Sequence, residues 1–567
     1  MIPEKPTRRT FLGGAAALCG TLATPRSAHA SQASSKETHA SSYFDVLRAP
    51  DSITGFSGIE SPLPMNAQAG EWKYKDIQVT TAVAKTDAET ELQIRLTSPK
   101  SSLTHLHLRW NFRIPSSLRC LGDQWERSYG DLEWRGIVPE RVMPWYFLTF
   151  DGQNLHGYGV KTQPSAFCFW QLDPEGISFW TDVRNGGNPV ELGQRELRVA
   201  TIVTCQGKPG EPPIAVARQF CKQMCPTPRL PAGPLFGSND WNYAYGRNSA
   251  DGILHDADLI ASAAPQGEHR PFVVIDDGWQ DKSRFPDMSA LAANIRKRKL
   301  HPGIWIRPLR AAKDAHASLL LPAARFGESH ASPAYDPTIP EALETILDTI
   351  KAPVRWGYEF IKHDFSTYEM LGRWGSSMGA EPTAPGWSFA DRTLTSAEII
   401  LRFYRSLRDA AGENTTILGC NTIGHLAAGI FESQRIGDDT SGTKWERTRR
   451  MGVNTLAFRM PQHRTFSYID PDCVAFTKDI DWFYTRQWLD VVARSGTSLF
   501  VSPQREATGP EQLAALKDAL ALAVSSQGFA EDWFDNTAPQ QWQFQSKEID
   551  SRRYDWSENK GAFPFQV

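Results

Sequence analysis

The second half of the sequence repeats one pattern, in which a short apolar run ends in polar residues and a helical stretch leads to the next run. Runs of this length predict buried strands, and their alternation with helices predicts βαβ units in a parallel sheet. Eight such units between residues 234 and 528 predict a (β/α)8 barrel. The eight runs are 235–241, 272–277, 303–307, 358–364, 416–421, 430–439, 455–459 and 498–504.

Residues 46–225 have a different pattern, because apolar and polar residues alternate there with period two, as in 77–83 and 103–110. This alternation, broken by turn clusters such as 185–189, predicts an N-terminal antiparallel β-sandwich. A helix is expected over 215–224 at the end of this domain.

Two further boundaries complete the predicted multidomain fold. The segment 226–233 is rich in proline, which breaks helices and stiffens linkers, so we expect it to join the sandwich to the barrel at residues 234–528. Residues 529–567 contain strand-like pieces such as 541–544 and predict a short C-terminal β segment.

The N-terminus has the order of features that is typical of a twin-arginine export signal. Arg8 and Arg9 precede a weakly apolar stretch over 13–22, and a small-x-small cleavage pattern ends at Ala30. We expect residues 1–30 to be removed on export to the periplasm or the outside of the cell, and residues 31–45 to form a linker. No other stretch reaches the ~18 apolar residues that a membrane span needs.

Composition narrows the class of protein. With 41% apolar residues, 22% charged residues and a formal net charge of -3, the chain is typical of globular proteins, and nothing indicates nucleic acid as a partner. Seven cysteines follow the signal, an odd and sparse set that argues against a disulfide scaffold. Cys221 and Cys225 lie one helical turn apart and are expected to be buried thiols. No histidine or cysteine spacing matches a zinc site, so we expect no metal and no cofactor.

The ends of the predicted strands carry the candidate site. The carboxyl ends of barrel strands face one mouth, where carboxylates and cations can bind sugar hydroxyls and indoles can cover a ring face. Two aspartates on different strands can supply the two carboxyl groups of glycoside hydrolysis. The residues at these ends are Trp241, Asp276, Asp277, Trp305, Lys362, Asp364, Cys420, Arg435, Asp439 and Arg459.

Several blocks of residues at these strand ends match a known family, and their order is more specific than any one motif. The chain resembles glycoside hydrolase family 36, the α-galactosidases of the clan shared with family 27, over nearly its whole mature length. The resemblance implies a retaining hydrolase that releases terminal α-galactosyl residues from oligosaccharides or glycoconjugates through a covalent glycosyl-aspartate. The blocks are 274–279, 302–305, 360–365, 417–420, 435–440 and 470–473.

The resemblance implies that Asp364 is the nucleophile and Asp439 the acid/base. The run before Asp364 places Lys362 on the same strand face, and a lysine beside an aspartate favours the ionised, attacking form. Asp438 competes for the acid/base role, and the spacing from Arg435 favours Asp439. We expect the charge of Asp364 to raise the pKa of Asp439, and the two carboxyl groups to lie ~5–5.5 Å apart.

The same resemblance implies the residues that bind the sugar. Asp276 and Asp277 match the pair that binds the hydroxyls distinguishing galactose from glucose. Arg435 and Cys420 match residues near the 2-hydroxyl, where this chain departs from the family because 421–425 replace small residues. The full substrate-binding set is Asp276, Asp277, Trp305, Lys362, Cys420, Arg435 and Trp241.

Several alternatives stay open. An α-N-acetylgalactosaminidase or a β-L-arabinopyranosidase would use the same mechanism, and a transferase would pass the glycosyl unit to another sugar instead of water. A non-catalytic carbohydrate-binding protein would keep the barrel, although both candidate catalytic aspartates are present. A metal-dependent hydrolase is the least favoured, because no ligand spacing supports it.

Overall fold

The computed structural model describes residues 43–68, 70–85, 89–327, 332–545 and 549–557. The predicted export signal at 1–30, most of the predicted linker at 31–45 and the final residues 558–567 lie outside this description. Within it, no helix is long and apolar enough to cross a lipid bilayer. The predicted domain boundaries and the predicted export stay predictions.

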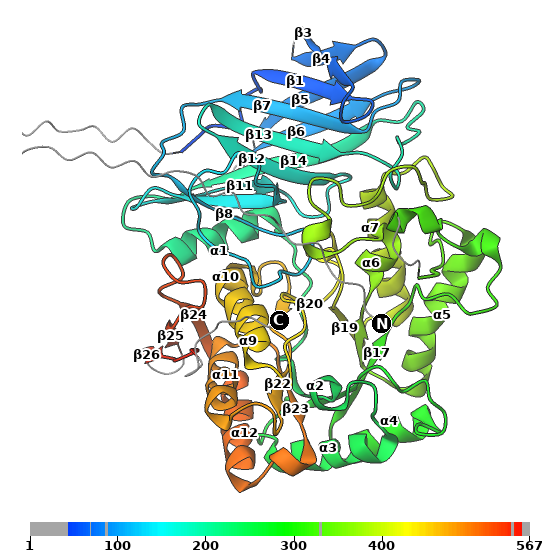
Figure 1. The fold of residues 1–567 in the computed structure, drawn as a ribbon, viewed down its shortest axis with the longest axis vertical. Coiled ribbons are helices and arrows are strands. Elements are labelled where there is room, and N and C mark those ends of the chain that lie inside the picture. The colour runs from blue at the N-terminus through cyan, green and yellow to red at the C-terminus, as the bar shows by residue number, and fades with distance from the viewer. Residues whose placement is uncertain (1–42, 69, 86–88, 328–331, 546–548, 558–567) are drawn as a thin grey trace, which may run out of the picture. The chain divides into compact units, whose positions relative to one another are not determined.

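Residues up to 206 form two antiparallel sheets, as the sequence predicts for the N-terminal region (Figure 1). Their inner faces pack together, since the buried rings of Phe147 and Trp170, one from each sheet, lie 5.6 Å apart. The first sheet has the order β2 (Pro62–Pro64), β1 (Ser52–Phe56), β7 (His105–Asn111), β13 (Gly176–Asp182), β12 (Phe167–Asp173) and β9 (Met143–Pro144). The second has β3 (Asn66–Gln68), β4 (Glu71–Tyr74), β5 (Ile77–Lys85), β6 (Thr90–Thr97), β14 (Leu197–Gln206), β11 (Leu155–Val160), β10 (Tyr146–Phe150) and β8 (Arg119–Gly122).

The expected helix follows these sheets as α1 (Pro213–Met224) and begins on a proline, which suits the first helical turn. Its Phe220 lies directly on Gly157 of β11, where an added Cβ would come within 2.4 Å of the ring. The glycine therefore allows α1 to pack closely against the second sheet.

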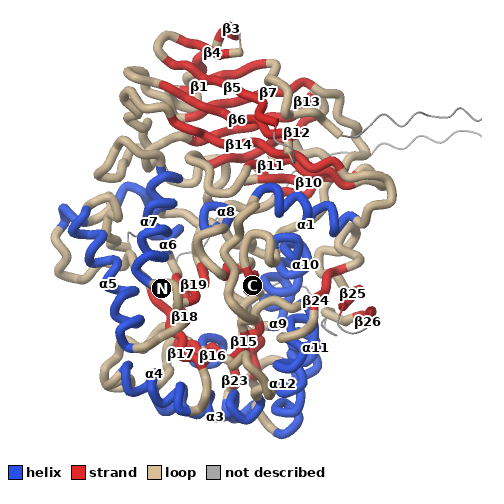
Figure 2. Tube along the Cα trace, turned by 180° about the vertical axis from the view of Figure 1, so that it is seen from behind, coloured by secondary structure: helices blue, strands red, loops and turns tan. Residues whose placement is uncertain are grey.

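A curled sheet of nine parallel strands forms the second half, with helices along its outside (Figure 2). Its two edge strands are consecutive in the chain and are separated by residues 471–473 alone. The order is β21 (Tyr468–Asp470), β20 (Ser433–Arg435), β19 (Thr416–Gly419), β18 (Phe360–His363), β17 (His301–Ile306), β16 (Phe272–Ile275), β15 (Phe236–Asn239), β23 (Leu499–Pro503) and β22 (Val474–Phe476). The longer helices are α3 (Ala250–Ala263), α4 (Met288–Lys297), α5 (Pro340–Trp356), α7 (Ser396–Ala411), α11 (Trp482–Ser495) and α12 (Pro510–Ala523).

One predicted strand is wrong. The run 455–459 forms helix α10 (Thr455–Arg459), and the corresponding strand lies further on, as β21 and β22. The run belongs to a continuous helical segment with α9 (Trp445–Thr448), the π-helix η4 (Arg449–Asn454) and η5 (Met460–Gln462). All five residues of α10 are buried, so the run shows no amphipathic period that would separate a helix from a buried strand.

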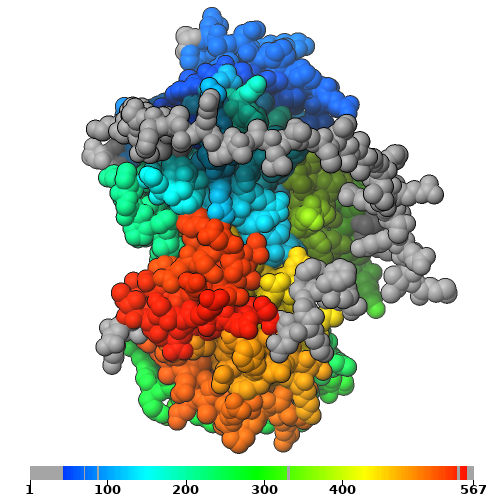
Figure 3. Space-filling model, turned by 60° about the vertical axis from the view of Figure 1, so that its left-hand side comes forward, coloured from blue at the N-terminus to red at the C-terminus, as the bar shows by residue number. Residues whose placement is uncertain are grey.

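The end of the described chain forms a three-stranded antiparallel sheet of β24 (Gln527–Ala530), β25 (Gln541–Gln545) and β26 (Ile549–Arg553), which includes the strand expected at 541–544. The C-terminal region, red in Figure 3, lies against the orange part of the chain that precedes it, which includes residues of α11. There the hydroxyl of Tyr554 donates to Asp490 at 2.7 Å.

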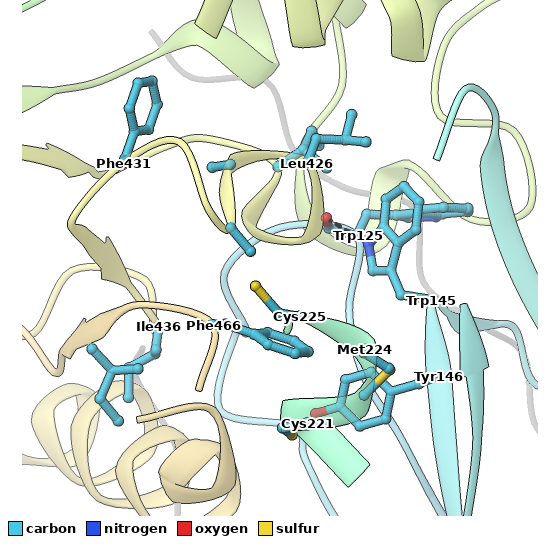
Figure 4. Close-up of a cluster of buried hydrophobic side chains, with 14 of the residues drawn as sticks. Trp125, Trp145, Tyr146, Cys221, Met224, Cys225, Leu426, Phe431, Ile436 and Phe466 are labelled. Carbon is cyan, nitrogen blue, oxygen red and sulfur yellow. Dashed lines mark hydrogen bonds between the residues drawn. The ribbon is translucent and has the colours of Figure 1, made fainter. Parts of the chain in front are cut away.

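The core continues from the N-terminal sheets into the second half of the chain. Figure 4 shows one such cluster, in which Trp125, Trp145 and Met224 face Leu426 and Phe466. All seven cysteines of the described part are buried and unbridged, and among them Cys221 and Cys225 are buried thiols as the sequence predicts.

Candidate functional site

The candidate site forms where the parallel strands end, and an ion pair joins two of those ends. The ammonium of Lys362, on β18, lies 2.6 Å from a carboxylate oxygen of Asp276, which follows β16. Both side chains are buried. Burial acts to lower the pKa of Lys362, but the charge of Asp276, together with smaller contributions from Cys420 and Cys473, raises that pKa well above its usual value. Lys362 is therefore a fixed cation whose partner is Asp276.

Asp364 follows β18 and is held by two donors while staying partly exposed. The indole N–H of Trp305 donates to Oδ2 at 3.1 Å, and the backbone N–H of Phe365 donates to Oδ1 at 2.7 Å. Phe365 adopts a left-handed conformation with φ 65°, which is rare for an aromatic residue, and this turn brings its N–H to the carboxylate. These two hydrogen bonds fix the orientation of the Asp364 carboxylate.

Asp276 and Asp277 differ in their surroundings. Asp276 is buried and accepts from Lys362, from the side chain of Asn239 at 2.8 Å and from the N–H of Asp277 at 2.8 Å. Asp277 is partly exposed, and its Oδ1 accepts from Gly278 N at 3.0 Å. Asp277 thus keeps hydrogen-bonding capacity for a ligand.

A third carboxyl group, Asp240, lies behind this pair. It is buried, and it accepts from the N–H of Asp276 at 2.7 Å and from the amide of Asn248 at 2.6 Å. Burial and the charge of Asp276 raise the pKa of Asp240 to about 7.

Arg435, at the end of β20, is the centre of an ion-pair network. Its Nε lies 2.9 Å from Asp470, its Nη2 lies 2.6 Å from Asp472, and its Nη1 lies 3.2 Å from Asp439. The guanidinium is fully buried. The last residue of β21 and the short segment after it therefore fix Arg435, and Arg435 in turn holds Asp439.

Asp438 and Asp439 have different partners. Asp438 uses both oxygens in ion pairs, with Arg127 at 2.7 Å and Arg447 at 2.6 Å, and its side chain is 16% exposed. Asp439 pairs with Arg435 and lies 3.7 Å from Arg127, with 37% of its side chain exposed. Asp439 is thus the more accessible of the two carboxylates.

The pKa of Asp439 differs from the expected direction. Burial acts to raise it, but the positive charges of Arg127, Arg435 and Lys362 outweigh burial and hold this pKa below its usual value. The sequence-based expectation considered only the like charge of Asp364, and it omitted cations that reach Asp439 from other segments.

The remaining predicted site residues do not all lie at the ends of strands. Trp305 is buried against Asp364, while Trp241 opens the short helix α2 (Trp241–Ala244) and is half-buried. Cys420 is fully buried, and Arg127 lies 3.9 Å from its sulfur. Arg459 is not at a strand end, because it belongs to α10 and pairs with Asp123 at 2.6 Å.

Sequence reasoning missed a loop of the N-terminal region, residues 123–129, which reaches the site. Its backbone pairs with the segment after β20, where Ser128 N donates to Ile436 O at 2.8 Å. It supplies Arg127 to Asp438 and Asp439, and it supplies the buried Glu126 to Asn421. Nothing in the local pattern of this loop marks it, because its partners lie far away in the sequence.

A further cation, Arg307 at the end of the predicted strand 303–307, has no role that the sequence assigns, and it lies near Asp364. Arg307 donates to Glu369 at 2.6 Å and to Ser332 at 2.9 Å, and it lies over the ring of Phe365, 4.2 Å from its centroid. Burial raises the pKa of Glu369 to about 7, although the charge of Arg307 opposes this shift. In the described part of the chain, no group of three or more His, Cys, Asp or Glu residues is arranged to hold a metal ion.

Comparison with known proteins finds similar folds. No protein-family model matches the chain. The α-galactosidase TtGalA from Thermus thermophilus, solved with p-nitrophenyl α-D-galactopyranoside, is 18% identical with a TM-score of 0.58, over 84% of this chain and 97% of that one. The family 36 α-galactosidase AgaA from Geobacillus stearothermophilus is 12% identical with a TM-score of 0.59, over 85% and 74% of the two chains. The galactosidase domain of the α-galactosidase-sucrose kinase AgaSK is 13% identical with a TM-score of 0.56, over 89% and 80%. At these identities the likeness establishes a common fold.

Proposed function

We propose that this chain is a retaining glycoside hydrolase of the family 36 type that releases terminal α-galactosyl residues, and that its parallel sheet acts as a (β/α)8 barrel. One observation carries the proposal. Two partly exposed carboxylates, Asp364 and Asp439, follow β18 and β20 of the same sheet, beside the hydroxyl-binding candidates Asp276 and Asp277. We also propose that residues 1–30 direct export.

The chemistry proceeds in two displacements. Asp364 attacks the anomeric carbon while the bond to the leaving oxygen breaks, and Asp439 gives its proton to that oxygen. In the second step Asp439 takes a proton from water, the water oxygen attacks the anomeric carbon, and the bond to Asp364 breaks. Trp305 and the N–H of Phe365 orient Asp364 for attack through their hydrogen bonds.

Protonation of Asp439 sets the working pH. The group must carry a proton when the leaving group departs, whereas its neighbouring cations lower its pKa in the free enzyme. We therefore expect an optimum on the acid side of neutrality for substrates whose leaving group needs protonation.

Substrate recognition rests on the Asp276–Asp277 pair. Asp277 has a partly exposed carboxylate that can accept from two adjacent sugar hydroxyls, and Asp276 keeps Lys362 in place beneath them. Arg127 lies 3.9 Å from the sulfur of Cys420 and would form the wall beside the expected 2-position. This wall favours a plain 2-hydroxyl over an N-acetyl group.

Turnover of three nitrophenyl glycosides tests the function. We expect the α-galactoside to be hydrolysed with the highest kcat/KM, ahead of the β-L-arabinopyranoside and the α-N-acetylgalactosaminide, with the α-anomer of galactose formed first in NMR spectra. No turnover of the α-galactoside would overturn the proposal, and release of the β-anomer first would overturn the retaining mechanism. Product analysis at high sugar concentration separates hydrolysis from glycosyl transfer.

A further inference from the structure

An exposed tryptophan lies beside the candidate site without a role in the proposed chemistry. Trp374, in the loop 372–379 after helix α6 (Ser366–Leu371), is 37% exposed. Its ring centroid lies 4.6 Å from that of Tyr368 and 6.0 Å from that of Phe365, the residue directly after Asp364. Single exposed apolar side chains are ordinary on protein surfaces, so it is the neighbours of Trp374 that indicate a role.

The same indole also lies near the other carboxylate. The guanidinium carbon of Arg127 is 6.0 Å from the centroid of Trp374, and the guanidinium nitrogens reach Asp438 at 2.7 Å and Asp439 at 3.7 Å. The indole of Trp374 therefore lies next to Phe365, which follows the proposed nucleophile, and next to Arg127, which is close to the proposed acid/base. The leaving group of a substrate has to depart on the side of the acid/base.

The loop that carries Trp374 is held at several points by the 123–129 loop. Gly375 N donates to the buried carboxylate of Glu126 at 2.9 Å, and the indole N–H of Trp125 donates to Gly379 O at 2.7 Å. Gly375 has φ 53°, and an added Cβ would come within 2.7 Å of the ring of Tyr129. The exposure of Trp374 is thus a property of an anchored loop.

We propose that Trp374 is the stacking platform of a leaving-group subsite, which binds the sugar ring attached to the scissile oxygen. An anchored indole presents a flat apolar face with little ordering cost, and sugar rings have apolar faces that match it. This inference rests on the proposed function, and it names the class of leaving group as a pyranose ring.

Two substrates with different leaving groups test the subsite in Trp374→Ala. An α-galactosyl disaccharide has a ring to stack, whereas α-galactosyl fluoride has none. We expect kcat/KM to fall about 10-fold for the disaccharide and less than about 2-fold for the fluoride, with most of the disaccharide activity restored in Trp374→Phe. Phe483→Ala is the matched control, because Phe483 is 46% exposed on α11, and we expect it to change neither value.

Three outcomes would overturn the subsite. Equal losses on both substrates would mean that Trp374 acts only through the structure of the site, and no loss on either would mean that nothing stacks there. A wild-type enzyme that turns over neither substrate would overturn the proposed function, and the subsite with it. An active wild type with equal losses in Trp374→Ala would overturn the subsite alone.

Discussion

At the scale of single residues, the two candidate aspartates of the site differ in the groups that contact their carboxylates. Asp364 accepts hydrogen bonds from uncharged donors, the indole of Trp305 and a backbone N–H. Asp439 lies among guanidinium groups, with Arg435 at 3.2 Å and Arg127 at 3.7 Å. The two carboxylates therefore differ in environment, as the proposed nucleophile and the proposed acid/base must.

The products formed with azide distinguish the proposed nucleophile from the proposed acid/base. In Asp364→Gly, azide fills the space of the missing carboxylate and should form β-galactosyl azide, whereas in Asp439→Gly it should attack the glycosyl-enzyme and form α-galactosyl azide. Without azide we expect each variant to lose about 10³-fold or more in kcat for a disaccharide. Asp438→Asn is the control, with an expected loss of less than about 10-fold. The opposite pairing of azide products would exchange the assigned roles.

Arg127 should control the pH range in which Asp439 works. Its charge contributes to the lowered pKa of Asp439, so Arg127→Met should raise that pKa and move the alkaline limb of the kcat/KM profile to higher pH. Arg127→Lys keeps the charge and should leave the limb closer to that of the wild type. The measurement needs a disaccharide, because its leaving group requires the proton. An unmoved limb in Arg127→Met would contradict this role.

At the scale of elements, the 123–129 loop joins segments that are distant in the chain. Glu126 is buried and accepts from Asn421, from Gly375 N at 2.9 Å and from the hydroxyl of Tyr129 at 2.5 Å. Asn421 is fully buried and points to this carboxylate. The unusual residue after Cys420 is therefore a structural link to the N-terminal region.

Glu126→Ala should destabilise the protein strongly. It leaves the buried amide of Asn421 and the N–H of Gly375 without their acceptor, which costs about 2–4 kcal/mol of unfolding free energy. Urea denaturation measures the loss. Glu71→Ala is the control, since Glu71 pairs with Lys73 at the surface and should cost less than about 1 kcal/mol. Equal losses in both variants would show that the link contributes little.

At the scale of the whole molecule, buried polar contacts join the two halves of the described chain. Arg459 of α10 lies 2.6 Å from Asp123, and the amide of Gln462 donates to the same carboxylate at 2.9 Å. The amide of Gln462 also donates to the hydroxyl of Tyr146 at 2.9 Å, and Tyr146 belongs to the cluster of Figure 4, which has residues from both halves. The N-terminal sheets and the parallel sheet should therefore unfold together.

Calorimetry tests this coupling. We expect one transition in the wild type, and in Arg459→Met a single transition that is about 3–5 kcal/mol less stable, because Asp123 loses its charged partner. Arg392→Met removes the exposed pair with Glu191 and should cost less than about 1 kcal/mol. Two separate transitions, with only one of them shifted in Arg459→Met, would contradict the coupling.

The sequence by itself determined the features that depend on local residue patterns and on the direction of the strands. Alternation in 77–83 predicts β5, and the apolar run before Lys362 predicts β18 and places that residue and Asp364 at the end of a strand. The carboxyl ends of parallel strands share one edge, so most of the candidate site followed from these short runs. The same local reasoning failed at 455–459, where a fully buried helix has the apolar run of a strand.

Only the tertiary structure decided which distant groups meet at that edge. Arg127 reaches Asp439 from a loop of the N-terminal region, Lys362 pairs with Asp276, and Trp374 is anchored through Glu126. A charge shifts a pKa according to its distance in space. The lowered pKa of Asp439 therefore depends on cations that no local sequence pattern places beside it.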